Sequence, residues 1–284
     1  GSEMCIRDRG IIIPEVYTQM LNEKIAGKVK ISNYAVEIGT LGDFANEGDS
    51  ITFPQFSALS EAELLARGSE ISTEELKQTE SKKEVKHYAK GVSILDIDAL
   101  EGKGNFLENA INQQAEIFAR ARDKECVEDI DTNAILKSAT VGASAITEEE
   151  LINALNRWGD DQDDSTFDAI VINSKLLPSF YKMDGFVNST KTYVQDGNGT
   201  IVNGVVGYYR TIPVVLSNVG TFDSTANECK TYILKKGALG KKDKKQGVEI
   251  ELDRVAKYKR TDVLADELFV IGLIQKDGAC ICLL

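Results

Sequence analysis

Histidine, the side chain that most often acts as a general acid or base near neutral pH, occurs once in the 284 residues, as His87. A hydrolytic relay needs an imidazole within hydrogen-bonding reach of a serine or cysteine nucleophile. No nucleophile motif accompanies His87, which stands between Lys86 and Tyr88 in a strand-like segment. We therefore expect His87 to be a surface residue and not a catalytic group.

Two short segments carry oxygen side chains of the kind that bind divalent cations. One is an acidic turn with Asp160, Asp161, Asp163 and Asp164, and the other is Asp196-Gly-Asn-Gly-Thr200. Calcium loops place ligands at alternate positions and close with a glutamate, a pattern that neither segment has. Asn-Gly favours a tight hairpin turn in the second segment. A low-affinity cation site at the acidic turn stays open as the minor alternative.

The cysteines are five in number and include no CxxC pair: Cys5, Cys126, Cys229, Cys280 and Cys282. This pattern indicates neither a disulfide framework nor a zinc site. On a strand, Cys280 and Cys282 would share one face, and we expect them to be buried. The glycine motifs of phosphate-binding loops, GxGxxG and GxxxxGK(S/T), do not occur in a suitable context. The sequence therefore predicts no catalytic residue, no metal site and no cofactor.

The overall charge is acidic, with 45 Asp and Glu against 33 Lys and Arg, a net charge of -12. A dedicated nucleic-acid binder needs a surplus of cations to neutralise phosphates, so this class is disfavoured, although a container for nucleic acid is not. No window approaches the roughly 18 apolar residues of a membrane span, and the N-terminus lacks the layout of a signal peptide. We expect a protein that is made and used in the cytoplasm, without membrane contact.

One basic cluster and one acidic segment have opposite charge. A lysine-rich turn is predicted at 235–245, and Glu61 to Glu80 carries six acids against two bases. Opposite patches can steer identical subunits into register, although each exposed ion pair contributes only about 0.2–1 kcal/mol. We hypothesise that the turn contacts the acidic segment of a neighbouring subunit. A simple solvated turn is the alternative.

The first elements of the chain are a short helix and two strands. The helix is predicted between Pro14 and Gly27. Its apolar positions are Val16, Met20, Leu21 and Ile25. The strands are Asp49–Phe56, which its proline confines to a sheet edge, and Val85–Leu95. Between them Ser57–Glu84 is long and polar, and because such loops are uncommon inside compact domains, we expect an arm that projects from the body.

The strongest helix pattern opens with the capping pair Asn105 and Glu108 and runs to Ile130, a rod of about 40 Å at 1.5 Å per residue. A second capping box, Thr147 with Glu150, starts a helix that stops at Gly159. Later elements are a strand Phe167–Ile172, a capped short helix Asn173–Tyr181, a β stretch Ile201–Val219 and three or four strands within Lys230–Leu284. Helices and strands are segregated along the chain, which predicts the α+β class.

In their order, these parts resemble the tailed-phage major capsid proteins of the Hong Kong ninety-seven type fold, which encapsulin shells share. The segments similar to that family's N-terminal arm, extended loop and spine helix are Ile13-Pro-Glu-Val-Tyr17, Gly48-Asp-Ser-Ile-Thr-Phe-Pro54 and Gly91-Val-Ser-Ile-Leu-Asp-Ile-Asp98. The most specific segment is 203–217, from Asn203 to Ser217, which resembles the hairpin of the axial domain. The stretch from Val248 to Arg254 resembles the closing strands.

The resemblance implies a division of the chain. Residues 1–46 would form an N-terminal arm, and 47–92 would form the extended loop. From their own sequence, which opens with Gly-Ser and has no helical or strand period, we expect residues 1–9 to be an expression scar or non-native. A peripheral domain would combine 93–145 with 221–284, and an axial domain would span 146–220. Because the arm begins almost at once, the resemblance implies a separate scaffold protein or none.

The resemblance also implies a function, and it is a structural one with no enzymatic activity. Hexamers and pentamers of the chain would build an icosahedral shell around double-stranded DNA, with portal and scaffold proteins as further partners and non-specific contact with the packaged DNA. The location would be the virion capsid, assembled in the host bacterial cytoplasm. The residues predicted to contact other subunits are Ile51, Phe53, Phe56, Glu61, Glu63, Glu70, Glu74, Glu75, Lys241, Lys242 and Lys244, with Tyr208, Tyr209 and Arg210 near the capsomer axis.

Two other functions stay open at this stage. An encapsulin-type compartment would use the same fold to enclose a cargo enzyme, and neighbouring genes would separate it from a phage capsid. An α+β enzyme with an unrecognised site is the other, and the missing catalytic constellation speaks against it.

Overall fold

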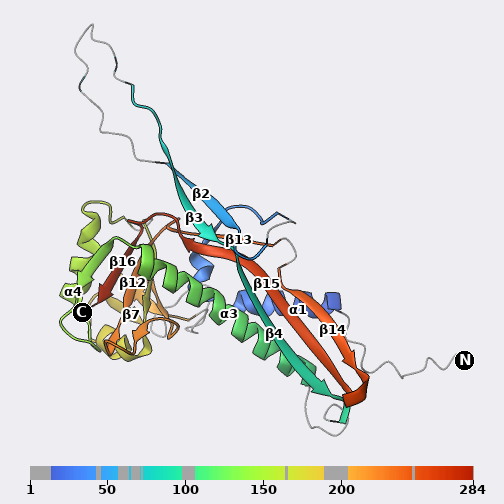
Figure 1. The fold of residues 1–284 in the computed structure, drawn as a ribbon. Coiled ribbons are helices and arrows are strands. Elements are labelled where there is room, and N and C mark those ends of the chain that lie inside the picture. Colours follow the sequence, from blue (N-terminus) through green and yellow to red (C-terminus); the bar gives the residue numbers. More distant parts are fainter. Residues whose placement is uncertain are drawn as a thin grey trace, which may run out of the picture.

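The structure of the chain is a computed structural model that describes residues 14–42, 46–56, 64, 71, 73–97, 106–163, 166–188, 204–244 and 247–283. Its described part is elongated. A lobe built around a seven-stranded sheet lies at one end, a finger of long strands backed by two helices extends away from it, and a two-stranded ribbon projects from the region between them (Figure 1).

Two long helices, α1 (Pro14–Lys28) and α3 (Phe106–Asn133), pack against each other along the finger. The stripe of α1 that faces α3 consists of Tyr17, Leu21 and Ile25. This stripe corrects part of the sequence analysis, because Val16 and Met20 are exposed. Residues four apart share a helix face, so the stripe that starts at Tyr17 leaves Val16 and Met20 on the other side.

Helix α3 confirms the long rod expected from the sequence, while its expected N-cap Asn105 lies outside the described residues. Its buried face includes Ala110, Ile111, Ala115, Phe118, Cys126 and Ile130. Helix α4 (Glu148–Leu155) starts at the expected capping box, in which the Thr147 hydroxyl accepts the Glu150 N–H at 3.3 Å and the Glu150 carboxylate accepts the Thr147 N–H at 2.7 Å. A short 3-10 turn, η2 (Asn156–Trp158), then leads to Gly159.

The lobe is organised by a seven-stranded mixed sheet. Its strands, in spatial order, are β5 (Leu136–Ala139), β16 (Ala279–Leu283), β12 (Thr231–Lys235), β6 (Phe167–Ile172), β9 (Ile212–Leu216), β8 (Val205–Tyr209) and β7 (Phe186–Asn188). Helix α4, the turn η3 (Ser174–Leu176) and α5 (Leu177–Phe180) pack on one face, and the end of α3 packs on the other. The apolar run of β6 follows from this, since both of its faces are covered.

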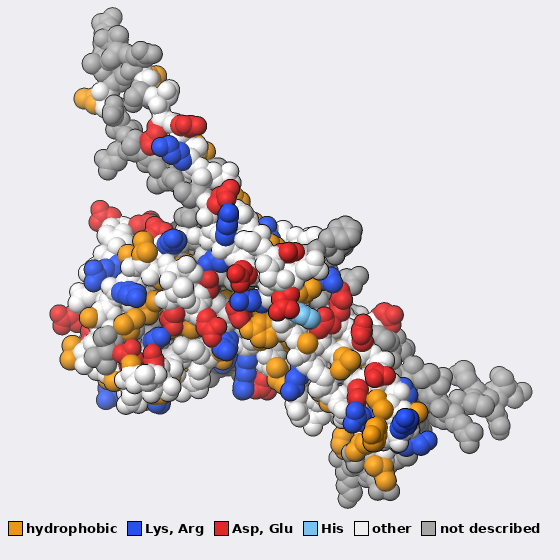
Figure 2. All heavy atoms as spheres, viewed as in Figure 1, with side chains coloured by type: hydrophobic (Ala, Val, Ile, Leu, Met, Phe, Trp, Pro, Cys, Tyr) orange, Lys and Arg blue, Asp and Glu red, His pale blue; other side chains and the backbone are white. Residues whose placement is uncertain are grey.

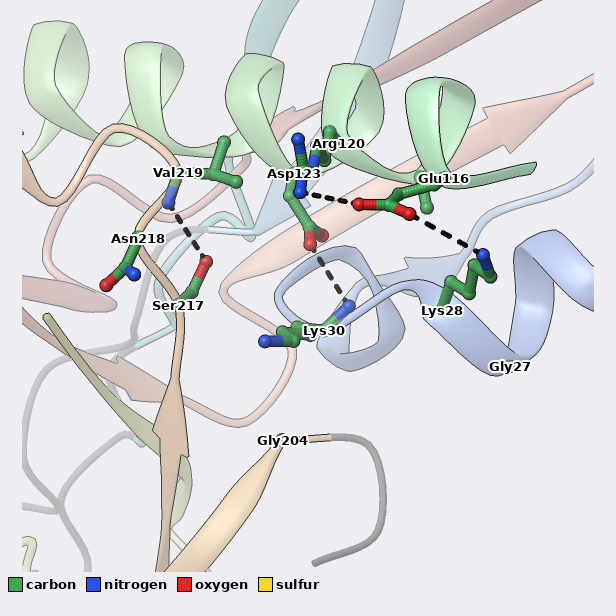
Figure 3. A pocket seen from close by; sticks show the side chains of 11 residues that line it. Gly27, Lys28, Lys30, Glu116, Arg120, Asp123, Gly204, Ser217, Asn218 and Val219 are labelled. Atoms are coloured by element: carbon green, nitrogen blue, oxygen red, sulfur yellow. Dashed lines mark hydrogen bonds and ion pairs between the residues drawn. The ribbon is translucent and has the colours of Figure 1, made fainter. Parts of the chain in front are cut away.

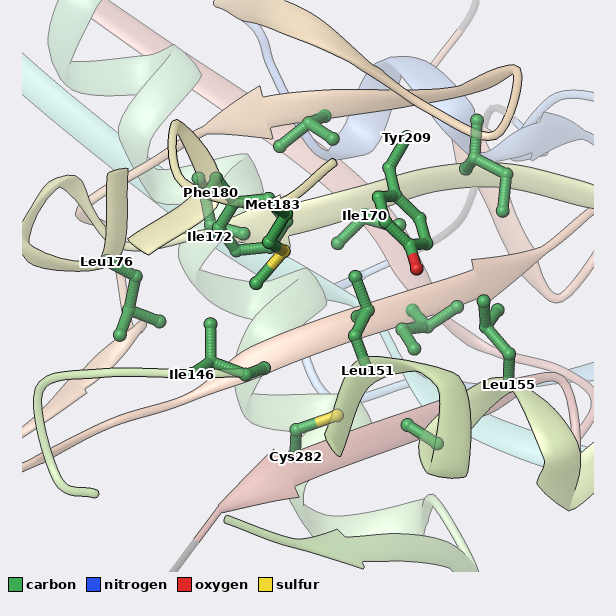
Figure 4. Packing of buried hydrophobic residues seen from close by; sticks show 14 of the residues in the cluster. Ile146, Leu151, Leu155, Ile170, Ile172, Leu176, Phe180, Met183, Tyr209 and Cys282 are labelled. Carbon is green, nitrogen blue, oxygen red and sulfur yellow. The ribbon is translucent and has the colours of Figure 1, made fainter. Parts of the chain in front are cut away.

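The core between the sheet and α4, η3 and α5 is densely apolar (Figure 4). Ile170 and Ile172 point into it from β6, and Phe180 and Leu151 close it from the helices. Cys280 and Cys282 lie in the same cluster and are buried, as expected from their spacing on a strand. Cys5 lies outside the described residues.

The finger is a second sheet, formed by β1 (Val36–Glu37), β13 (Leu239–Asp243), β15 (Arg260–Leu273), β14 (Glu249–Val255) and β4 (Lys86–Leu95). The long strand β15 pairs with β13, β14 and β4, and buries Val263 and Ala265 against the two long helices. The remaining elements are the turns η1 (Ser32–Tyr34) and η5 (Ala256–Tyr258) and the small hairpin β10 (Phe222–Asp223) with β11 (Glu228–Cys229).

The structure corrects three expectations about strands. The segment 230–283 contains five strands and not three or four. The expected lysine turn at 235–245 contains strand β13, which has Lys241 and Lys242 in its ladder. The polar arm segment is not all loop either, because its last seven residues form β3 (Gln78–Glu84), which pairs with β2 (Ser50–Phe56), whereas β4 pairs with β15. One sheet also combines β5, β12 and β16 with strands of the segment 146–220.

Candidate assembly surfaces

The root of the projecting ribbon is fixed to its own chain by an apolar contact. Strands β2 and β3 pair over seven residues, from Ser50 opposite Glu84 to Phe56 opposite Gln78. Phe53 is 0% exposed and packs with Leu41, Val85, Val270 and Ile274, with the Lys242 ammonium 5.3 Å from its ring centre. Phe53, which the sequence analysis assigned to subunit contact, is therefore a core residue of this chain. Ile51 packs at the edge of the same cluster.

A partly buried ion pair holds the other strand of the ribbon. The Lys83 ammonium lies 2.6 Å from both carboxylate oxygens of Asp129 on α3. The same carboxylate also accepts the Leu273 N–H at 2.6 Å and the Asn133 side-chain amide at 2.9 Å. Hydrogen bonds of this charged kind are shorter and stronger than neutral ones, so this pair ties β3 to α3 at the base of the ribbon.

Beyond the root the described part of the ribbon is exposed. Glu74 and Glu75 lie on its surface, and the apolar side chains Leu64, Ile71 and Leu76 are 102%, 70% and 56% exposed. Glu61, Glu63 and Glu70 lie outside the described residues, as does the side chain of Phe56. Exposed apolar side chains grouped on one projecting element indicate an interaction surface.

The three predicted lysines have different surroundings. The Lys244 ammonium pairs with Glu249 at 2.5 Å, and Lys242 lies over Phe53. Lys241 has no ion pair within the described part of the chain and lines a hollow of about 350 Å³ with Asn22, Arg122 and Asp243. Of the three, Lys241 is the cation with the most freedom to meet an acidic group from outside.

The hairpin between β8 and β9 carries the other predicted contact residues. Tyr209 is buried, and its hydroxyl donates to Glu148 at 3.3 Å, so this side chain belongs to the core of the lobe and not to a surface. Burial raises the pKa of Tyr209. Arg210 is exposed and Tyr208 is half-buried, so both can reach a neighbour. Arg210 and Thr211 form the turn with φ of 48° and 79°, a left-handed conformation that non-glycine residues adopt at a cost.

The histidine and the acidic turn that the sequence analysis considered for catalysis or metal binding form ion pairs and hydrogen bonds at the surface. His87 lies on β4, with Nε2 3.2 Å from an Asp266 carboxylate oxygen and Nδ1 3.8 Å from Glu47. In the acidic turn, a hydrogen bond from Lys235 holds the pKa of Asp161 below its ordinary value. In the described ranges, no three His, Cys, Asp or Glu side chains are grouped to hold a metal ion. Asp164 and the segment 196–200 lie outside those ranges.

One buried charge network was missed by the sequence analysis. The Arg122 guanidinium of α3 donates to the buried carboxylate of Glu267 on β15 and, at 3.2 Å, to Asp243 on β13. Burial raises the pKa of Glu267, and Arg122 opposes this rise. The network ties α3 to two strands of the finger. An arginine among the apolar positions of α3, between Phe118 and Cys126, was the available signal.

The comparisons with known proteins found phage capsid proteins, both among curated sequences and among solved structures. No protein-family model matches the sequence. The major capsid protein of Staphylococcus phage phiMR11 is 25% identical over 268 residues, which cover 94% of this chain and 92% of that protein.

In the described part of the chain, no helix is both long enough and apolar enough to span a membrane.

Solved capsid structures have the same fold. The capsid of a native GTA particle matches with a TM-score of 0.62 at 11% identity, covering 91% of this chain and 89% of that one. The capsid of Cyanophage P-SCSP1u matches with a TM-score of 0.60 at 17% identity, covering 90% and 88%. The chain therefore has the α+β fold of phage capsid proteins, the Hong Kong ninety-seven type, and is similar to a phage major capsid protein over nearly its whole length.

Proposed function

We propose that this chain is the major capsid protein of a tailed bacteriophage, a structural subunit without catalytic activity. Copies of it assemble as hexamers and pentamers into an icosahedral shell that encloses double-stranded DNA. The likeness to a phage capsid protein over 94% of the chain supports this proposal. The observation that carries it is the β2–β3 ribbon, which projects from the body (Figure 1), with Leu64, Ile71 and Leu76 exposed in the segment that joins its two strands.

A ribbon of this kind needs cover from elsewhere. A two-stranded hairpin is marginal in water by itself, and in the described residues β2 and β3 pair only with each other. In the proposed shell the ribbon lies on an adjacent subunit, so part of the folding free energy is gained only on assembly. Contacts between different surfaces of identical subunits close into rings when the rotation permits.

The proposed contact residues are those of the sequence analysis without the two that are buried in the core, Phe53 and Tyr209. They are Ile51, Phe56, Glu61, Glu63, Glu70, Glu74, Glu75, Lys241, Lys242, Lys244, Tyr208 and Arg210. Tyr208 and Arg210 would lie near the capsomer axis, within an axial domain. Lys241 would receive a carboxylate from the neighbouring ribbon, in keeping with its lack of an ion pair in the described part of this chain.

The further partners and the location belong to the same proposal. A portal protein, a scaffold protein and packaged DNA would complete the particle, which would form in the cytoplasm of the host bacterium. An encapsulin compartment uses the same fold, but the relatives and structures reported above are capsids, so we do not propose it.

The ribbon gives the proposal a direct test. Because Phe56 pairs with Gln78, the residues 57–77 can be replaced by an Asn-Gly turn that joins β2 to β3 without changing their register. We expect the shortened protein to remain a folded, soluble subunit and to form no particles in electron micrographs, while the full-length protein forms closed shells. Circular dichroism and thermal melting of both proteins control for folding, and closed shells from the shortened protein would contradict the proposed role of the ribbon.

A further inference from the structure

A hollow of about 630 Å³ lies where the end of α1, the middle of α3 and the segment after β9 meet (Figure 3). Three cationic side chains line it, Lys28, Lys30 and Arg120. Ser217 and Asn218 form part of the opposite wall. None of the residues proposed for subunit contact lies in it, so it is separate from the assembly surfaces described above.

The carboxylates that line the hollow are already engaged. Asp123 accepts the backbone N–H groups of Lys30, Ile31 and Ser32 at 3.1, 2.9 and 2.9 Å. Glu116 pairs with Arg120 at 2.5 Å and with Lys28 at 3.8 Å (Figure 3). Both carboxylates are thus held by groups of the wall, and their two negative charges stand against the three positive charges of the cationic side chains.

The polar groups that keep spare capacity are donors. The Lys30 ammonium donates to the carbonyl oxygen of Leu216 at 2.9 Å, a neutral partner that leaves its charge uncompensated. The Asn218 side chain uses its oxygen to accept the Ser174 N–H at 3.0 Å, which leaves the two N–H donors of its amide. A concave site whose unused groups are cationic or donating is suited to an anion with several acceptor oxygens.

We propose that this hollow binds phosphate groups of the nucleic-acid backbone. The inference rests on the proposed function, since a shell subunit has one face toward the packaged DNA. The spare donors are the ammonium of Lys30, the amide of Asn218 and those N–H groups of the Arg120 guanidinium that its ion pair with Glu116 does not use. Groups of these kinds hold phosphate oxygens in proteins. In a chain of net charge -12, phosphates can approach closely only where such donors are concentrated.

The sheet face of the finger, on the side away from α1 and α3, has the opposite charge character from the hollow. There Glu249 lies opposite Asp266 and Asp253 lies opposite Asp262 across the β14–β15 ladder, so like charges are adjacent. Figure 2 shows acidic side chains along this face, beside the single histidine. A nucleic acid would be repelled there, which favours the helical side of the finger, with α1 and α3, as the side that meets the contents of the shell.

A matched pair of substitutions at Gly27 tests the site without removing any packing. A Cβ at Gly27 would meet nothing within 4 Å, so Gly27→Asp adds a carboxylate to the wall of the hollow and Gly27→Ala adds only its Cβ. The double variant Lys30→Met/Arg120→Gln removes two cations, and Lys124→Met removes an exposed cation of α3 that does not line the hollow. Binding of a labelled oligonucleotide duplex and of pyrophosphate is measured on the full chain.

We expect Gly27→Asp and the double variant each to bind the duplex about tenfold more weakly than the wild type, and the double variant to reduce the slope of log affinity against log salt by about 2. Gly27→Ala and Lys124→Met should stay within about twofold of the wild type, since neither changes the charge of the hollow. Equal losses in the control variants, or no binding of the duplex by the wild type at millimolar concentration, would overturn the inference.

The pyrophosphate arm separates the two sources of phosphate. Weaker binding of both probes by Gly27→Asp supports the assignment to nucleic acid, whereas a site that binds pyrophosphate but not the duplex contradicts it. Electron micrographs of the same variants keep the two proposals apart. If shells form while binding is unchanged, the phosphate site is wrong and the capsid function stands. If the wild type forms no shells, the capsid function fails.

Discussion

The seven-stranded lobe buries its apolar side chains, whereas the outer part of the β2–β3 ribbon exposes them. In the lobe, Ile170, Ile172 and Phe180 are completely buried by elements of the same chain. In the ribbon, Phe53 is buried at the root, while Leu64 and Ile71 further out are exposed. The lobe is stabilised within one subunit, and we propose that the outer ribbon is covered by another copy of the chain. Substitutions in the two regions should therefore affect different measurements.

The largest effect on subunit stability is expected in the lobe. Phe180→Ala removes a fully buried ring that packs against Phe186 with a centroid distance of 5.9 Å. Such a change leaves a cavity and costs about 3–5 kcal/mol of unfolding free energy. Urea denaturation of the unassembled subunit measures the loss, and a cost below about 1 kcal/mol would mean that the lobe is not the stable core we describe.

An intermediate effect is expected at the ribbon root. Lys83→Met removes the ammonium and leaves the Asp129 carboxylate with only the Leu273 N–H and the Asn133 amide. Leaving one partner of a partly buried pair uncompensated should cost about 2 kcal/mol, less than for a fully buried pair. Lys82→Met on the exposed side of the same strand is the control and should cost almost nothing. Equal melting temperatures for the two variants would show that the ion pair does not anchor the ribbon.

Much of the lobe could be predicted from the sequence, because short stretches of residues specify its helix cap and its buried strand. The pairing of the ribbon strands could not be predicted in this way. The capping box at Thr147 and the apolar run of β6 are readable from short windows and were confirmed. Strand β3 has no alternation of apolar and polar residues, because neither of its faces lies on a large core, so it was taken for loop. The Lys83–Asp129 pair joins residues 46 apart, and no local pattern reports a contact at that separation.

A smaller effect, with a pH dependence, is expected at the start of α4. Burial alone would raise the pKa of Glu150, but hydrogen bonds from Thr147 and Val141 outweigh it and hold the pKa below its ordinary value of 4.5. A lowered pKa contributes stability that is present above the ordinary value and lost as pH falls through the folded value. Glu150→Gln should thus cost about 0.5–1 kcal/mol at neutral pH.

The difference between wild type and Glu150→Gln should shrink as the pH falls below 4.5, because the wild-type carboxyl then also becomes neutral. Thermal melts of the two proteins across the acid range measure it. A difference that stays constant through that range would show that the charge of Glu150 does not contribute.

The smallest effect on the isolated subunit is expected on the outer ribbon. Ile71→Ser with Leu76→Ser removes two exposed apolar side chains and should change the unfolding free energy by less than about 0.5 kcal/mol. The same double variant should form far fewer particles than the wild type, because these side chains find cover only on a neighbour. A wild-type particle yield from this double variant would contradict the claim that the ribbon is stabilised by a neighbouring subunit.

The most direct measurement of the central claim is cryo-electron microscopy of the purified wild-type protein at high concentration. We expect closed icosahedral shells in which the ribbon of each subunit lies on an adjacent copy and Leu76 is covered. A protein that stays a compact monomer, with the ribbon folded against its own body, would contradict it.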